Sequence, residues 1–266
     1  MCLLLFGVDA HPRHRLVVAA NRDEVHARPA APLAWWDDAP DVLAGRDLEA
    51  GGTWMGVTRD GRWAALTNVR DPLNPRPSER SRGDLVADFL RQDILAEAYA
   101  AQVFADRDAY DGFNLVLADR DGVWSVSRRV DHPVTLGPGV YGLSNDRLDT
   151  PWPKVERGRR LLRAALADDA VATDALLDLL DDQHQPPDAA LPKTGVGLEW
   201  ERRLAPMRIV SDGYGTRVST ALLVGRDGEV EVAEQTWRPD GSSAGPAQRV
   251  LLSTKGESEY GRNRTD

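Results

Sequence analysis

Cysteine is almost absent from the 266 residues, since Cys2 is the single example. A lone cysteine excludes a disulfide within the chain, so nothing in the sequence implies an oxidising compartment. It also removes most zinc-binding patterns, and the five histidines show no ligand spacing. We therefore expect no metal site in this protein.

The sequence also lacks a basic excess and a long apolar run. Its 33 Lys and Arg against 42 Asp and Glu leave a net charge of -9, so no positive excess is available to neutralise nucleic-acid phosphates. The apolar stretch CLLLFGV is far shorter than the roughly 20 residues of a membrane span, and no Lys or Arg precedes it as in a signal peptide. We expect a cytoplasmic protein with no transmembrane segment and no nucleic-acid partner. The oligomeric state is not indicated.

Short β-type runs joined by tight turns dominate the pattern. Residues 2–9 and 16–24 are two apolar runs around a turn-like segment, which predicts an opening hairpin. Three further hairpins are predicted over 53–69, 115–128 and 219–237, because each has two β-type runs around an Asp-Gly dipeptide. These features indicate antiparallel sheet.

Helical periodicity occurs in three stretches between the hairpins. Apolar residues recur at a spacing of three to four over 84–105, 153–168 and 172–182. Antiparallel strand blocks with helices inserted between them are typical of α+β layers. We predict a single domain over 2–237. Residues 238–266 form a polar C-terminal extension whose last part is expected to be flexible.

The position of Cys2 directly after the initiator methionine suggests a nucleophile. Removal of Met1 would place the thiol beside a free α-amine, whose pKa is about 7.7–8.0 against about 8.5 for a thiol. Such an amine can act as general base for the neighbouring thiol. The alternative is a buried strand residue, since free cysteine is among the most buried residue types.

Four polar residues, Asn21, Arg22, Asp23 and Glu24, follow the second apolar run directly. If the first two strands pair antiparallel, the end of the second lies near the start of the first, where Cys2 is. Asp23 or its neighbours would then hold the α-amine and tune it electrostatically. The alternative is a turn with an ordinary surface ion pair, which contributes little.

Asparagine and arginine also stand at the ends of other predicted strands. Asn68 and Arg70 close one strand, Asn145 closes another, and Arg217 opens a third. An Asn amide fixed at a strand end is a suitable donor to an oxyanion. The alternative for each is a turn former or helix-entry residue. Trp54 is among several tryptophans that would line an apolar cleft or pack in the core.

Taken together, several ordered motifs resemble the NRDE family, also known as the transport and Golgi organisation protein 2 family. The motifs are MC at the start, ANRDE, GGTWMGVTRDGRWAALTNVR, GLSN followed by LDTPWPKV, and YGTRVSTALLV, and they cover roughly residues 2–237. That family is similar to the cysteine branch of the N-terminal nucleophile hydrolases, which includes bile-salt hydrolases, penicillin V acylases and acid ceramidase. The resemblance implies an αββα sandwich of two antiparallel sheets with helices outside.

The resemblance also implies roles for individual residues. Cys2 matches the nucleophile, and Asp23 matches the aspartate that contacts the α-amine. Asn68 and Asn145 match the two oxyanion-side asparagines, and Arg217 is a match to the distal arginine. The acylases carry an Arg three residues before the aspartate, whereas this chain has Ala20 there. Arg22 would replace that charge from another direction, or the amidase machinery is incomplete.

Two functions follow, and both remain open at this point. In the first, Cys2, Asp23, Arg22, Asn68, Asn145 and Arg217 hydrolyse an amide or thioester of a small acylated molecule without a cofactor. In the second, the same cleft carries haem, acyl-CoA or another lipid, as the family's biology implies, and the NRDE tetrad is a structural clamp. A structural interaction domain is a third option. The residues expected to contact the bound molecule are Asn21, Glu24, Arg70 and Trp54.

Overall fold

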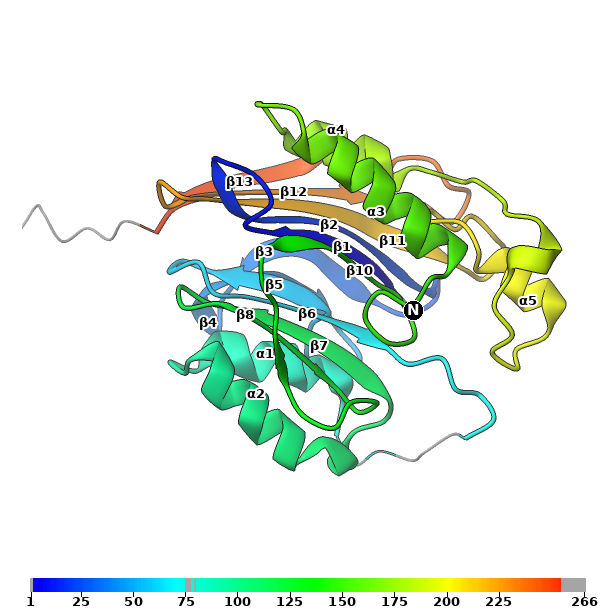
Figure 1. Cartoon of the computed structure of the whole chain (residues 1–266), viewed down its shortest axis with the longest axis horizontal. Helices are drawn as coiled ribbons and strands as arrows, with labels where there is room; N and C mark the ends of the chain where they lie inside the picture. The colour runs from blue at the N-terminus through cyan, green and yellow to red at the C-terminus, as the bar shows by residue number, and fades with distance from the viewer. Residues whose placement is uncertain (1, 75–77, 79, 255–266) are drawn as a thin grey trace, which may run out of the picture.

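Two antiparallel sheets lie face to face, with two helices against the outer side of each (Figure 1). This arrangement comes from a computed structural model that describes residues 2–74, 78 and 80–254. The four layers confirm the predicted α+β, αββα architecture, in which each sheet buries one face on the other sheet and one on helices.

The first sheet has the strand order β10-β1-β2-β11-β12-β13, with every neighbouring pair antiparallel. Its strands are β1 (Cys2–Val8), β2 (His14–Val25), β10 (Gly139–Leu143), β11 (Tyr214–Gly225), β12 (Glu229–Thr236) and β13 (Gln248–Ser253). The opening hairpin is confirmed, and Cys2 pairs with Arg22 in its register.

The second sheet has the order β3-β4-β5-β6-β7-β8-β9. Its strands are β3 (Ala30–Trp36), β4 (Ala39–Asp47), β5 (Met55–Thr58), β6 (Trp63–Asn68), β7 (Phe113–Ala118), β8 (Val123–Ser127) and β9 (Val134–Thr135). The three Asp-Gly hairpins are present as the pairs β5–β6, β7–β8 and β11–β12. Gly61 and Gly228 have φ of 82° and 89°, the left-handed conformation that such reversals favour.

Strand β1 is apolar throughout because both of its faces are covered. Leu3 and Leu5 pack with the helix layer, whereas Leu4 and Phe6 pack between the two sheets. Successive side chains of a strand point to opposite faces, so an alternating pattern would leave polar groups in one of these cores. Burial of Phe6 alone contributes about 2–3 kcal/mol. These two cores hold the start of β1, and therefore Cys2, in place.

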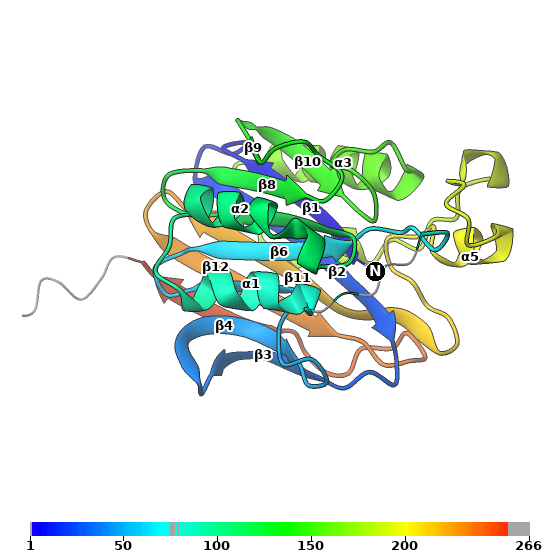
Figure 2. The same ribbon diagram turned by 90° about the horizontal axis from the view of Figure 1, so that it is seen from below.

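The helices cover the outer faces as layers. Helices α1 (Arg82–Arg91) and α2 (Ala96–Ala105) lie over the second sheet (Figure 2), and α3 (Pro153–Leu166) and α4 (Thr173–Leu180) over the first. A shorter helix, α5 (Leu198–Arg203), and the 3-10 turns η1 (Arg107–Ala109) and η2 (Asp188–Ala190) complete the described elements. Within the described ranges, no helix has the length and apolar character needed to cross a membrane.

The predicted helical stretch 84–105 is two helices rather than one. The chain leaves helical geometry at Gln92 and resumes it at Ala96. The Arg62 guanidinium donates to the carbonyl oxygens of Phe89 and Gln92 at this break. Carbonyls at a helix end have no partner inside the helix, and this arginine supplies one from the turn between β5 and β6. The periodicity of the stretch does not reveal such a partner.

Strands β3, β4, β9 and β13 were not foreseen. Strand β13 lies within residues 238–266 and pairs with β12, which places part of the polar extension in the first sheet. Its burial alternates weakly and Leu251 is exposed, so its hydrophobic pattern is poor. The flexible end that we predict for the extension lies beyond residue 254, outside the described residues.

Glu234 links the two sheets and gives a pH-dependent prediction. Its buried carboxyl accepts hydrogen bonds from the backbone N–H of Leu33 (2.8 Å) in β3 and from the Thr220 hydroxyl (3.3 Å), and burial raises the pKa of Glu234 to about 7. In the unfolded chain the Glu234 carboxyl ionises near the ordinary glutamate pKa. The free energy of unfolding should therefore fall as pH rises from that value to about 7. Glu234→Gln cannot ionise. We expect its stability advantage over the wild type to grow by about 2–3 kcal/mol between pH 5 and pH 8, as measured by urea unfolding. An equal difference at both pH values would contradict this.

Candidate active site

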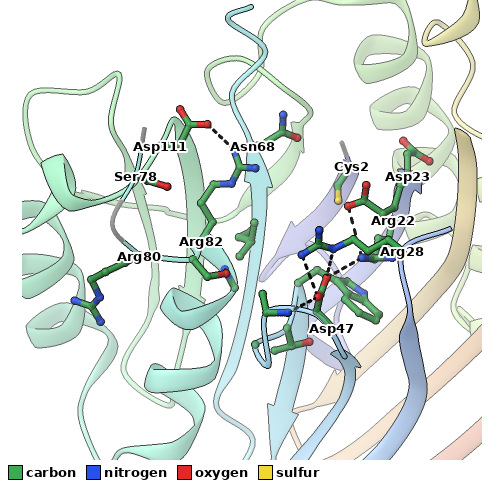
Figure 3. A pocket seen from close by; sticks show the side chains of 18 residues that line it. Cys2, Arg22, Asp23, Arg28, Asp47, Asn68, Ser78, Arg80, Arg82 and Asp111 are labelled. Atoms are coloured by element: carbon green, nitrogen blue, oxygen red, sulfur yellow. Dashed lines mark hydrogen bonds and ion pairs between the residues drawn. The ribbon is translucent and has the colours of Figure 1, made fainter. Parts of the chain in front are cut away.

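A cleft of about 440 Å³ opens at the end of the sandwich where β1 begins (Figure 3). The end of β2, the end of β4, the end of β6 and the start of α1 form its walls, so four separate parts of the chain meet there. Eight charged side chains line the cleft, namely Arg22, Asp23, Glu24, Arg28, Asp47, Arg80, Arg82 and Asp111. The cleft is therefore suited to a polar or charged group of a ligand.

Cys2 lies on the wall of this cleft and is half-buried (Figure 3). The Ser144 hydroxyl donates to its carbonyl oxygen (3.2 Å), which fixes the start of β1 against the end of β10. Burial raises the pKa of the Cys2 thiol, and the positive charges of the amino terminus and of Arg22 oppose that rise. The thiol therefore needs a base beside it to become a nucleophile.

Asp23 is fully buried and directly follows Arg22, the residue of β2 that pairs with Cys2. The Thr216 hydroxyl donates to its Oδ1 (2.6 Å) across the β2–β11 pair. Burial raises the pKa of Asp23, and the charge of Lys154 is the largest influence that lowers it. The carboxyl and the thiol thus lie at the same end of the opening hairpin, as the hairpin register predicts.

Lys154 is a buried cation that sequence reasoning missed. It lies in the first turn of α3, is 4% exposed, and donates from Nζ to the Leu204 carbonyl oxygen (3.0 Å). Burial lowers the pKa of Lys154 to about 8, and the charge of Asp23 is the first of the influences that oppose this. Lys154 therefore brings positive charge to Asp23 and Cys2 from the helix layer.

Position 20, where the acylases carry an arginine, is Ala20 in this chain, and the positive charge of Lys154 acts on Asp23 from the helix layer. Ala20 pairs with Leu4 and packs, partly buried, between the sheets. The Arg22 guanidinium binds Asp47 (3.2 Å) and Glu24 (3.6 Å). The positive charge near Asp23 comes from another element of the fold.

Replacing Lys154 tests this electrostatic role. In Lys154→Met the Cys2 thiolate loses a favourable charge, so we expect alkylation of Cys2 by iodoacetamide at pH 7.5 to slow about two- to fivefold. Lys154→Arg keeps a cation and should retain most of the rate, with circular dichroism confirming the fold of both variants. Equal slowing in both variants would indicate a purely structural role.

Arg22, Glu24 and Trp54 form one side of the cleft. The Arg22 guanidinium lies over the Trp54 ring, 4.4 Å from its centroid, and is only 5% exposed. A Cβ at Gly45 would come within 2.4 Å of the indole, so only glycine leaves room for the ring. The positions of the guanidinium and the indole are therefore fixed by charge and by shape.

Asn68 and Asn145 lie together at the ends of β6 and β10. Asn68 lines the cleft with Cys2, and its amide N–H donates to the Val69 carbonyl oxygen at 3.5 Å. Asn145 is fully buried, and its amide donates to both the side-chain (3.0 Å) and backbone (3.1 Å) oxygens of Asn68. Asn68 thus presents a donor to the cleft, whereas Asn145 holds Asn68 in place.

Three other predicted residues lie away from the Cys2 cleft. Asn21 is buried on the helix side, where it donates to Leu180 and Met207 carbonyl oxygens and accepts from Ser219. Arg70 lines an adjoining cleft of about 570 Å³. Arg217 donates to the carbonyl oxygens of Val25 and Arg28 and lines a third cleft.

Some residues of the site were not predicted from the sequence. Each of them lies on an element far along the chain from Cys2. Asp47 at the end of β4 binds Arg22 and Arg28. Lys154 lies in the motif LDTPWPKV, from which we predicted the start of a helix and not a charged residue of the site. Within residues 2–74, 78 and 80–254, no group of three His, Cys, Asp or Glu side chains is placed to hold a metal ion.

Solved structures define the class of fold. The chain is similar to a Caenorhabditis elegans N-acylethanolamine-hydrolyzing acid amidase ortholog, with a TM-score of 0.50, 10% identity, and coverage of 84% of this chain and 92% of that one. It is also similar to the C2A mutant of the conjugated bile acid hydrolase from Clostridium perfringens, with a TM-score of 0.50, 9% identity, and coverage of 95% and 92%. The fold is therefore that of the N-terminal nucleophile hydrolases.

Sequence relatives define the family. The chain belongs to the Transport and Golgi organisation 2 family, whose model matches residues 1–239. It is 39% identical over 264 residues to the Bos taurus Transport and Golgi organization protein 2 homolog, and 35% identical over 257 residues to the Homo sapiens homolog. Both alignments cover 89% of this chain and 93% of the relative. The Drosophila melanogaster Transport and Golgi organization protein 2 is 28% identical over 266 residues, covering 89% of this chain and 92% of its own. The predicted family resemblance is confirmed.

Proposed function

We propose that this protein hydrolyses an amide or thioester bond of a small acylated molecule, with Cys2 as the nucleophile. The observation that carries the proposal is the position of Cys2, the first residue of β1, on the wall of a cleft that Asn68 also lines. Of the two solved structures of similar fold, one is named as an acid amidase and the other as a conjugated bile acid hydrolase, and both names support a hydrolytic reaction.

The proposed reaction has two halves. The Cys2 Sγ attacks the substrate carbonyl carbon, its proton passes to the α-amine, and the Asn68 amide donates to the oxygen that becomes negative. The carbon–nitrogen or carbon–sulfur bond then breaks, and the leaving group takes the proton from the α-amine. Water attacks the resulting thioester with the α-amine as base, which releases the acid and restores the thiol.

Electrostatics decide how the α-amine works in this proposal. Burial keeps the Cys2 thiol protonated, so the α-amine must take the proton as the bond to carbon forms. Asp23 and Lys154, both buried below the start of β1, set the charge around that amine. Arg22 is held away from them by Asp47, and it faces the ligand side of the cleft.

The experiment that tests the proposal compares two forms of the chain that differ only at the amino terminus. One begins at Cys2 after removal of Met1, and the other keeps a blocked residue before Cys2. Both are assayed against a panel of fluorogenic acyl amides and acyl thioesters, and their masses are verified. Hydrolysis by the first form alone supports the proposal, and equal rates or no hydrolysis by either form argue against it.

A carrier of haem or lipid is the second candidate, because Cys2 on the wall of the cleft is of a residue type that can hold haem iron. Haem iron is held by His, Cys, Met or Tyr, and among the described residues lining the cleft Cys2 alone is of these kinds. A haem Soret band that shifts in Cys2→Ala would support this function. A cytoplasmic location belongs to both proposals, rests on the sequence composition, and is tested by cell fractionation.

A further inference from the structure

Cys2 and Asn68 line one cleft but belong to different sheets (Figure 3). Cys2 begins β1 of the first sheet, and Asn68 ends β6 of the second. The distance between them is therefore set by the way in which the two sheets are joined at this end of the sandwich. An oxyanion donor must lie about 2.7–3.1 Å from the developing charge, so a small shift of one sheet against the other would weaken it.

The segment 144–146, directly after β10, joins the two sheets. Its three successive backbone carbonyl oxygens all accept hydrogen bonds from β6, from β7 or from the residues just after β6. The Thr67 hydroxyl donates to Ser144 (2.5 Å), the Arg70 N–H donates to Asn145 (2.7 Å), and the Asn114 amide donates to Asp146 (2.8 Å). The segment is thus attached to the second sheet, although β10 is a strand of the first.

Thr67 is held in one orientation within this junction. It pairs with Asn114 in the β6–β7 register, and the Asn114 amide also donates to the Thr67 hydroxyl oxygen (3.0 Å). The single hydroxyl hydrogen of Thr67 is then left for the Ser144 carbonyl oxygen. Both side chains are buried, at 0% and 1% exposed, where hydrogen bonds are stronger than in water.

The side chain of Ser144 connects the segment to both residues of the cleft. Its hydroxyl lies 3.2 Å from the Cys2 carbonyl oxygen and 3.2 Å from Asn145 Oδ1, and it donates its one hydrogen to these acceptors. The Asn145 amide in turn donates to Asn68. A continuous path of hydrogen bonds therefore runs from the backbone of Cys2 through Ser144 and Asn145 to Asn68.

We infer that Thr67 and Ser144 are positioning residues, which fix the Cys2 thiol relative to the Asn68 amide. This inference rests on the proposed function. Thr67 is fully buried and Ser144 is 2% exposed, so both act through Cys2 and Asn68 and not through contact with a ligand. A misplacement of about 1 Å can lower a rate about 10²-fold. The loss should fall on kcat, because the bond from Asn68 forms to the charge of the transition state.

Steady-state kinetics with the hexanoyl thioester of N-acetylcysteamine test the inference. In Thr67→Val and Ser144→Ala we expect kcat to fall about 10- to 100-fold, with KM within about threefold of the wild type. Thr67→Ser keeps the hydroxyl and should retain kcat within about threefold. Ser219→Ala is the matched control, because Ser219 is also buried and its hydroxyl donates to an asparagine, Asn21, that lies away from the cleft. Its kcat should equal that of the wild type.

Amide hydrogen exchange separates this inference from the proposed function. Mass spectrometry of peptides covering 66–72 and 139–146 reports the junction without any turnover. Faster exchange of both peptides in Thr67→Val and Ser144→Ala, but not in Ser219→Ala, supports the junction even if no form hydrolyses a substrate, in which case the hydrolase proposal alone fails. Unchanged exchange in both variants, a wild-type kcat in both, or an equal loss of kcat in Thr67→Ser or Ser219→Ala overturns the inference alone.

Discussion

Cys2→Ala is expected to lower hydrolysis of any accepted acyl substrate by at least about 10³-fold, because it removes the atom that forms the covalent bond. The substitution should leave the fold intact. Cys2 is the first residue of β1 and only half-buried, and the strand is held by Leu3, Leu4 and Leu5, which are buried in the two cores. Initial rates with a fluorogenic amide, together with thermal unfolding, measure the two effects separately.

Cys2→Ser is the matched control for this prediction. It keeps an oxygen nucleophile next to an α-amine but loses the greater nucleophilicity of sulfur, so its rate should fall between that of the wild type and that of Cys2→Ala. A Cys2→Ala chain that retains the wild-type rate would show that the reaction occurs elsewhere. A strong fall in melting temperature in Cys2→Ala would assign Cys2 to the core instead.

Breaking the ion pair between Arg70 and Glu201 is expected to destabilise the fold by about 3–5 kcal/mol. The two side chains are each 4% exposed and 2.8 Å apart, and Arg70 also lies over the Trp152 ring. Arg70→Met leaves the Glu201 carboxylate buried, with Thr194 as a remaining hydrogen-bond donor. The free energy of unfolding in urea measures the loss.

The double variant Arg70→Met with Glu201→Gln identifies the cause. It removes the uncompensated charge while Thr194 keeps an acceptor, so most of the lost stability should return. The pair between Arg202 and Asp188 lies on the surface, and Arg202→Met should change stability little. A double variant no more stable than Arg70→Met would contradict a charge effect and point to lost packing against Trp152.

The hairpin that positions the site could be predicted from sequence because its signal is local. Two apolar runs around a turn fix the β1–β2 pair, and the period of a strand then brings Arg22 opposite Cys2. The αββα layers follow from the same logic applied to three Asp-Gly hairpins and the helical stretches between them. Strands β3 and β13 escaped this reasoning because their burial patterns are irregular and each lies at the edge of its sheet.

The parts of the site that could not be predicted depend on contacts between distant segments. Lys154 reaches Asp23 only because α3 crosses the start of β1, and its residue type gives no sign of burial. Asn21 adjoins Arg22 in the tetrad, yet it bonds the end of α4 and the segment before β11. The sheet alternation sends neighbouring residues of β2 to opposite faces, so adjacency in a motif does not mean adjacency in a site.

The central claim is that Cys2, as the amino-terminal residue, forms a covalent acyl intermediate in this cleft. Intact-mass spectrometry of the chain, quenched in acid during turnover of a hexanoyl thioester, tests it directly. We predict a mature chain without Met1 that gains the mass of one acyl group on the peptide beginning at Cys2, and no such gain in Cys2→Ala. Retention of Met1, or a mass gain that persists in Cys2→Ala, would contradict the claim.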